Sequence, residues 1–210
     1  MLTIAEEFTL LAHAERDGRP LLPDERIALL LAAALLSELA VEERIELDED
    51  GGVRVIDRTR AGDEELDHAL ARLLELPHSC TPATWFGMLY STRRRARLLN
   101  RLAERGALVR EPGRFLARER FPEAEPRFER EVRDRIAAAL DGEWASDRTV
   151  ALLALAHAGG LVVRLFPGAD LGRIEQLTQG DWVGSALTSY YSKSKGMVET
   201  FMEAVTPLLD

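Results

Sequence analysis

The sequence predicts a mainly α-helical fold that is organised around one buried central helix and carries two short β-hairpins. Three observations lead to this prediction. A long segment after Pro23 is apolar almost all round, which is typical of a helix that is buried on every side. Other segments repeat apolar residues every three to four positions between capping and stop signals. Two shorter segments place strand-forming residues on both sides of a tight turn.

The first 55 residues are predicted to hold two helices and the first hairpin. A first helix begins after Thr3, because Thr3 and Glu6 have the spacing of a capping box. The central helix follows and includes residues 27–40. Apolar residues within 45–55 then flank residues 50–52, whose Asp-Gly-Gly composition favours a tight turn. We therefore predict a β-hairpin over this segment.

Helices dominate the rest of the chain. They are predicted at residues 63–75, 82–90, 92–105, 126–140, 147–158, 170–178 and 183–208, with an interruption of the last one near residues 192–196. A second hairpin is predicted around the Glu-Pro-Gly turn at residues 111–113. A chain of 210 residues with 46% apolar content buries one sizeable core. We expect a single helical domain over residues 1–210.

Charge and terminal composition limit the classes of function. The chain has 27 basic and 36 acidic residues, so its whole surface does not attract nucleic acid or anionic lipid. The single Cys80 excludes an intrachain disulfide and suits a reducing compartment. Glu6 and Glu7 stand where a signal peptide carries positive charge, and no apolar run reaches the roughly 20 residues that span a bilayer. We expect a cytoplasmic protein that is able to dock on the cytoplasmic face of a membrane.

A basic stretch interrupts this acidic chain. Residues 93–120 hold ten arginines against three glutamates, so the rest of the chain has a net charge near −16. Ser91 or Thr92 suits the N-cap of helix 92–105, and Gly106 suits its end. Three arginines in the first turn are unfavourable, because the positive end of the helix dipole repels each charge at a cost of about 0.3–1 kcal/mol. The arrangement becomes favourable when an anion binds the free N–H and guanidinium groups; the ordinary alternative is that the arginines pair with carboxylates or form a solvated face.

A helical wheel separates these arginines. The inward stripe consists of Leu98, Leu99 and Leu102. Arg95 projects within about 20° of Leu102 and is therefore expected on the buried side. The opposite, solvent-facing positions are Arg93, Arg97 and Arg101.

Two different classes of function explain an anion site at this helix. The helix and hairpin at residues 92–120 resemble a winged-helix module, in which the helix enters the major groove of DNA. Alternatively, the start of the helix binds a lipid phosphate, and Phe115 and Leu116 near the hairpin tip contact the bilayer. Composition does not separate the two classes, but the acidic balance leans against DNA, and we expect no nucleic-acid partner.

No motif predicts catalysis. The sequence has no phosphate-binding glycine loop, no paired cysteines or His-x-x-x-His for a metal, and no nucleophile elbow. We therefore expect no catalytic residue, no cofactor, no metal site and no enzymatic activity. Trp85, Trp144 and Trp182 are expected to cover the core with their amphipathic rings. Trp85 is also close enough in sequence to the basic helix to serve as an aromatic contact for a ligand there.

Four segments together resemble a known family. They are "LTIAEEFTLLA" (residues 2–12), "LLSELAVEERIELD" (35–48), "RARLLNRLAERGALV" (95–109) and "DRTVALLALAHAGGLV" (147–162). In this order and spacing they cover nearly the whole chain, which resembles the Golgi phosphoprotein 3 family in a bacterial form. The resemblance implies a largely helical single domain that docks on membranes by recognising phosphatidylinositol 4-phosphate. The eukaryotic members also act as adaptors for glycosyltransferases.

The resemblance also implies where a headgroup would bind. The family's pocket uses a tryptophan and three arginines, whose positions fall on Pro23, Ala32, Thr92 and Arg95. Arg95 alone keeps the family residue, so headgroup recognition is expected to be weaker by several kcal/mol, at about 1.5–3 per charge-assisted hydrogen bond. The expected headgroup-binding residues are Arg95, Arg93, Arg94 and Thr92. The expected function is peripheral, non-catalytic binding of an anionic phospholipid headgroup, with an adaptor role for membrane or glycosylation proteins as a further implication. Neither a cargo protein nor an oligomeric state is predicted.

Overall fold

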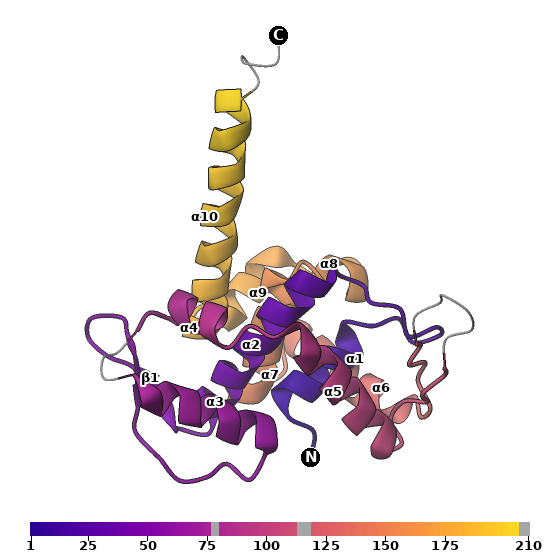
Figure 1. Ribbon diagram of the computed structural model, residues 1–210. Coiled ribbons are helices and arrows are strands. Elements are labelled where there is room, and N and C mark those ends of the chain that lie inside the picture. Colours follow the sequence, from indigo (N-terminus) through magenta and orange to yellow (C-terminus); the bar gives the residue numbers. More distant parts are fainter. Residues whose placement is uncertain (77–79, 113–118, 206–210) are drawn as a thin grey trace.

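The computed structural model describes residues 1–76, 80–112 and 119–205, with side chains up to Lys193. These residues form ten helices and one two-stranded antiparallel sheet (Figure 1). In chain order the elements are α1 (Ile4–Leu11), α2 (Asp24–Val41), β1 (Ile45–Leu47), β2 (Val53–Val55), α3 (Glu64–Glu75), α4 (Pro82–Met88), α5 (Thr92–Glu104), α6 (Arg127–Leu140), α7 (Asp147–Ala158), α8 (Val162–Leu165), α9 (Leu171–Thr178) and α10 (Trp182–Val205). The prediction of a mainly helical fold is confirmed.

Helix α2 lies at the centre of the molecule, as its apolar sequence predicts (Figure 1). Every residue from Ile27 to Leu39 is buried, and the helix contacts α1, α3, α4, α5, α7 and α10. Each fully buried leucine contributes about 1.5–3 kcal/mol through the water that its side chain avoids. The N-terminal turn of α2 reaches the surface, where Glu25 and Arg26 are exposed.

Two local structures, a capping box and a β-hairpin, form as the sequence predicts. The Thr3 hydroxyl accepts a hydrogen bond from the Glu6 N–H at 3.2 Å, and the Glu6 carboxylate accepts one from the Thr3 N–H at 2.8 Å. This capping box starts α1. Strands β1 and β2 pair antiparallel with Ile45 opposite Val55, which confirms the first hairpin.

The second hairpin differs from its prediction within the described residues. The chain pairs there through two isolated antiparallel bridges, Leu108 with Glu123 and Glu111 with Arg120, and not through regular strands. The predicted membrane-contacting residues, Phe115 and Leu116, lie outside the described residues.

Helix α10 is continuous, although the sequence suggested an interruption near residues 192–196 (Figure 1). The Ser192 hydroxyl donates to the carbonyl of Thr188 one turn earlier at 2.9 Å, and the single Gly196 costs only about 1 kcal/mol in a helix. The helix projects away from the rest of the molecule (Figure 1). No helix within the described ranges is both long and apolar enough to cross a membrane.

The three tryptophans occupy different environments. Trp85 is 1% exposed and lies inside the core, and Trp182 packs against the core from its edge. Trp144 is 88% exposed, so the expectation that it covers the core is wrong. It lies in the connection between α6 and α7, where no neighbouring helix packs over it.

Candidate functional site

The candidate site is the N-terminal end of α5, where the sequence predicts a binding site for an anion. Ser91 is the N-cap residue in extended conformation, but its hydroxyl makes no capping hydrogen bond. The first turn contains no acidic residue, and both Thr92 and Arg93 are exposed. The N–H groups at this end therefore receive no carboxylate from the turn itself, and an anion is favoured there by the helix dipole.

Arg94 is the most deeply buried arginine of this turn. Its side chain is 2% exposed, its Nε lies 2.9 Å from Oε2 of Glu65 on α3, and its Nη1 donates to the Leu89 carbonyl at 2.5 Å. The guanidinium group thus ties α5 to α3 and to the end of α4. A ligand would reach Arg94 only by breaking this internal pair.

Glu65 receives a second arginine, Arg97, on its other oxygen. Burial raises the pKa of the Glu65 carboxyl, but hydrogen bonds from Arg97 and Arg94 outweigh burial and hold that pKa below its usual range. Glu65 is therefore ionised at neutral pH. One buried carboxylate thus pairs with two arginines of the basic stretch and offsets one of their two positive charges.

Arg95 is partly buried and links α5 to α2 and to the turn after α1. Its Nε donates to Nε2 of His13, in the turn after α1, at 2.9 Å, and its Nη1 donates to Oδ1 of Asp24 on α2 at 2.6 Å. The side chain is 19% exposed, as the helical wheel predicts. Arg95, the residue that keeps the family's arginine, is thus partly buried with access to the surface, and its role in headgroup binding stays a prediction.

His13 is neutral because it is buried beside Arg95. Burial is the main cause that lowers its pKa to about 4, and the positive charge of Arg95 adds to it, against a hydrogen bond to the Thr9 carbonyl and the charge of Asp24. Its Nδ1 lies 2.6 Å from that carbonyl oxygen. Nδ1 therefore carries the proton, and Nε2 accepts the hydrogen bond from Arg95.

The second half of α5 is held by carboxylates from α1 and from the N-cap of α3. Arg101 contacts Glu6 at 2.8 Å and Asp63 at 2.7 Å, and Arg105 contacts Glu6 at 3.2 Å. The expectation that Arg101 faces solvent is wrong, since its side chain is 23% exposed. The wheel places the Cβ atom, whereas the long side chain bends back over the neighbouring helix.

An exposed tyrosine joins two hollows beside the start of α5. Tyr90 is 40% exposed. On one side it lines a hollow of about 550 Å³ together with His68, Ser91 and Arg93. On the other side it lines a hollow of about 380 Å³ that also includes Arg26. No periodic pattern could indicate this role for Tyr90, because the residue lies in the short connection between α4 and α5.

The second hollow is rich in aromatic residues. Tyr190 and Tyr191 of α10 line it opposite Tyr90. The Arg26 guanidinium lies 4.8 Å from the centre of the Tyr191 ring, within the range of a cation–π contact. This arrangement brings an exposed arginine of α2 close to the start of α5.

The positions at which the family resemblance implies headgroup-binding residues differ in their exposure to solvent. Pro23 is the N-cap residue of α2 and is exposed, whereas Ala32 is fully buried and offers no polar group. Trp85, in the core, is not available to a ligand. Tyr90 is an exposed aromatic ring that lines a hollow together with Arg93.

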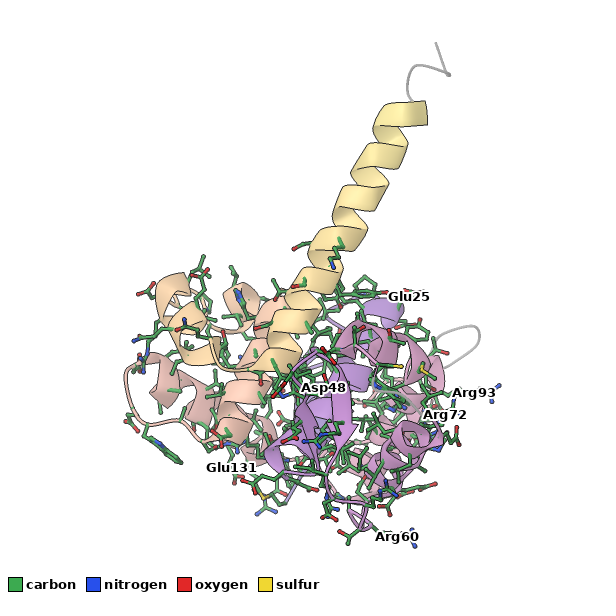
Figure 2. The ribbon with its side chains drawn as sticks, turned by 90° about the vertical axis from the view of Figure 1, so that its left-hand side faces the viewer. Glu25, Asp48, Arg60, Arg72, Arg93 and Glu131 are labelled. Atoms are coloured by element: carbon green, nitrogen blue, oxygen red, sulfur yellow. The ribbon has the colours of Figure 1, made fainter. Side chains whose placement is uncertain are left out.

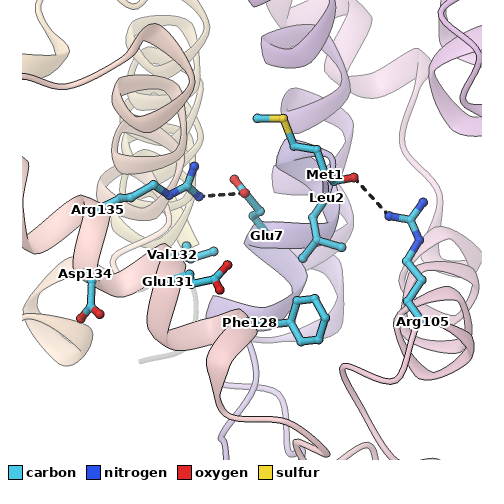
Figure 3. Close-up of a pocket in the computed structure, with 9 residues that line it drawn as sticks. All are labelled: Met1, Leu2, Glu7, Arg105, Phe128, Glu131, Val132, Asp134 and Arg135. Atoms are coloured by element: carbon cyan, nitrogen blue, oxygen red, sulfur yellow. Dashed lines mark hydrogen bonds and ion pairs between the residues drawn. The ribbon is translucent and has the colours of Figure 1, made fainter.

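A further hollow of about 680 Å³ lies between α1, α6 and the end of α5 (Figure 3). Arg135 points to Glu7 across it, with Nη2 and Oε1 2.7 Å apart. Burial raises the pKa of Glu7, against the charges of Arg135 and Arg148. Glu131 and Asp134 add negative charge at its rim (Figure 3), so this hollow does not favour an anion.

No metal site is found in the part of the chain that the structure describes, where no three His, Cys, Asp or Glu side chains are arranged to hold an ion. The sequence matches the family model of Golgi phosphoprotein 3 (GPP34) over residues 4–191. The match begins at α1 and ends within α10, so it includes α2, α5 and the whole candidate site. The chain therefore belongs to the Golgi phosphoprotein 3 family.

Proposed function

We propose that this protein is a peripheral, non-catalytic membrane protein that binds the headgroup of an anionic phospholipid at the start of α5. The family supports a Golgi-phosphoprotein-like role. The proposal adds the ligand class, the binding surface and the cytoplasmic face of a membrane as the location. An adaptor role for other membrane proteins is part of the proposal and rests on the family alone.

The proposed docking surface consists of Arg26, Tyr90, Thr92, Arg93 and Arg95. The observation that carries the proposal is that exposed Tyr90 forms the common wall of two hollows, one lined by Arg26 and the other by Arg93. Cations from α2 and α5 thus flank an aromatic ring beside a helix N-terminus. An anionic headgroup suits this combination, because arginines bind phosphate and the ring contacts an apolar or sugar face.

The nucleic-acid alternative receives less support. A recognition helix must present its cations to phosphates and bases. In α5, however, Arg94 and Arg97 share Glu65, and Arg101 is engaged by Glu6 and Asp63. The helix is therefore largely neutralised along its length, and its accessible charge is concentrated at its first turn.

Vesicle co-sedimentation tests the proposed function. Wild-type protein is mixed with neutral phosphatidylcholine vesicles and with vesicles that also contain phosphatidylglycerol, cardiolipin or phosphatidylinositol 4-phosphate. An arginine near an anionic surface contributes about 1 kcal/mol, so the combined Arg26→Ala, Arg93→Ala and Arg95→Ala substitutions lower the affinity by about 100-fold. Equal sedimentation with neutral and anionic vesicles would refute the proposal.

Arg60→Ala is the matched control. Like Arg93, Arg60 points away from the body of the molecule, in a different part of the surface (Figure 2), and its side chain is 87% exposed. Arg60→Ala removes the same charge as Arg93→Ala. A larger loss for Arg93→Ala than for Arg60→Ala would assign binding to the docking surface, whereas equal losses would indicate attraction by overall charge only.

A further inference from the structure

Two partners of Arg95, His13 and Asp24, differ in how readily a ligand displaces them. His13, which accepts from Nε, is 3% exposed and belongs to the core. Asp24, which accepts from Nη1, has a side chain that is 38% exposed. The Asp24 carboxylate is therefore the exchangeable partner of the guanidinium group.

Asp24 occupies the position that a bound anion would take. Its Oδ1 lies 2.6 Å from Nη1 of Arg95, slightly closer than the usual distance of about 2.7–2.9 Å in a charge-assisted hydrogen bond. Asp24 is also the first residue of α2, where the helix dipole favours its negative charge. A lipid phosphate that approaches Arg95 meets a like charge that is already bonded, so the carboxylate must turn away before the phosphate is able to bind.

We propose that Asp24 is an intramolecular competitor for Arg95 and that it sets the charge which a headgroup must bring in order to bind. This inference rests on the proposed function. A phosphodiester brings a single negative charge, like the carboxylate it replaces, and gains little by the exchange. A phosphomonoester carries about −1.5 to −2 at neutral pH and three acceptor oxygens, so it displaces Asp24 more readily. Asp24 thus favours phosphomonoester headgroups over simple phosphodiester headgroups.

His13 is the positioning residue of this unit. Its accepting Nε2 holds the guanidinium group in place from the buried side while the outer partner changes. Among the described contacts of Arg95, the titratable partners come from two other segments: His13 after α1 and Asp24 on α2. The exchange at Asp24 requires no rearrangement of the buried half.

Removal of the competing charge tests the inference. Asp24→Asn keeps the size of the side chain but weakens its hold on Arg95, and Glu25→Gln removes the same charge from the next residue, which is exposed (Figure 2). Binding is measured with vesicles that contain phosphatidic acid, a phosphomonoester, or phosphatidylglycerol, a phosphodiester. Loss of one negative charge alone raises affinity about 5-fold. Asp24→Asn is expected to raise affinity for phosphatidylglycerol vesicles roughly 10-fold more than Glu25→Gln does, and to reduce the preference for phosphatidic acid.

Two further variants keep the result interpretable. Arg95→Ala in the Asp24→Asn background should abolish the gain, because the released cation is then absent. Asp24→Ala repeats the test without a hydrogen-bonding side chain, and circular dichroism confirms the fold of each variant. If wild type binds anionic vesicles and Asp24→Asn behaves like Glu25→Gln, the inference is overturned while the proposed function stands. If neither wild type nor Asp24→Asn binds, both fail; if Asp24→Asn alone binds, the competition is confirmed directly.

Discussion

Removal of Glu65 is the strongest test of how α5 is held. Glu65 is 6% exposed and is bonded to Arg94 and Arg97. The substitution Glu65→Gln leaves the Arg94 charge buried without its carboxylate. Loss of one partner from a buried ion pair costs about 3–5 kcal/mol, because the remaining charge stays out of water.

The two arginines are expected to contribute very unequally to this loss. The Arg94 side chain is 2% exposed, whereas that of Arg97 is 50% exposed. A half-exposed pair contributes only about 0.2–1 kcal/mol, so Arg97→Gln should have a small effect. Nearly all of the free energy lost in Glu65→Gln should therefore belong to Arg94.

Urea denaturation followed by circular dichroism measures these differences. Glu65→Gln is expected to lower the free energy of unfolding by about 3–5 kcal/mol, which corresponds to a decrease in Tm of about 6–20 °C. Glu64→Gln is the matched control, because Glu64 is the preceding residue and is exposed. A loss below about 1 kcal/mol in Glu65→Gln, or one equal to that of Arg97→Gln, would refute the reasoning.

Three other predictions concern the pH dependence and local structure. His13 is neutral in the folded protein and its pKa is lowered to about 4, so the free energy of unfolding of the wild type should decrease by up to about 3 kcal/mol as the pH falls from 6.5 to 4. Urea denaturation measures this decrease, which should be smaller in His13→Gln. Gly18 has φ +61°, and a Cβ atom there would lie 2.3 Å from the backbone of Phe121. Gly18→Ala should therefore destabilise the protein far more than Gly51→Ala, because a Cβ atom at Gly51 meets no neighbour and costs only about 1–2 kcal/mol through its left-handed backbone. Thr3→Ala should cost about 1 kcal/mol by loss of the capping box, and an unchanged denaturation midpoint would contradict that.

Local patterns predicted the fold well because they depend on neighbouring residues. The apolar sequence of α2 and the Thr3–Glu6 spacing each fix an element without reference to distant parts of the chain. Helix α8 was not predicted, because four residues are too few to show helical periodicity. The second hairpin was predicted from its turn, and turn composition does not determine whether the flanking residues pair as regular strands.

The site was predicted only in part, because its arginines are sorted by distant partners. The wheel identified Arg95 correctly but passed over Arg94, although Arg94 lies one turn before Leu98 and thus on the inward stripe. No local pattern could have paired Arg94 with Glu65, which is 29 residues away. Such a pairing becomes visible only when the packing of α3 against α5 is known.

All the cations that hold α5 in place are arginines, and this has a practical consequence for labelling. The sequence contains two lysines, Lys193 and Lys195, and both lie in α10. Guanidinium groups stay protonated at every pH used for amine coupling, so they do not react with amine-directed reagents under mild conditions. A fluorophore coupled through amine chemistry will therefore attach to α10 or to the N-terminal amine, and the arginines of the docking surface stay unmodified for binding measurements.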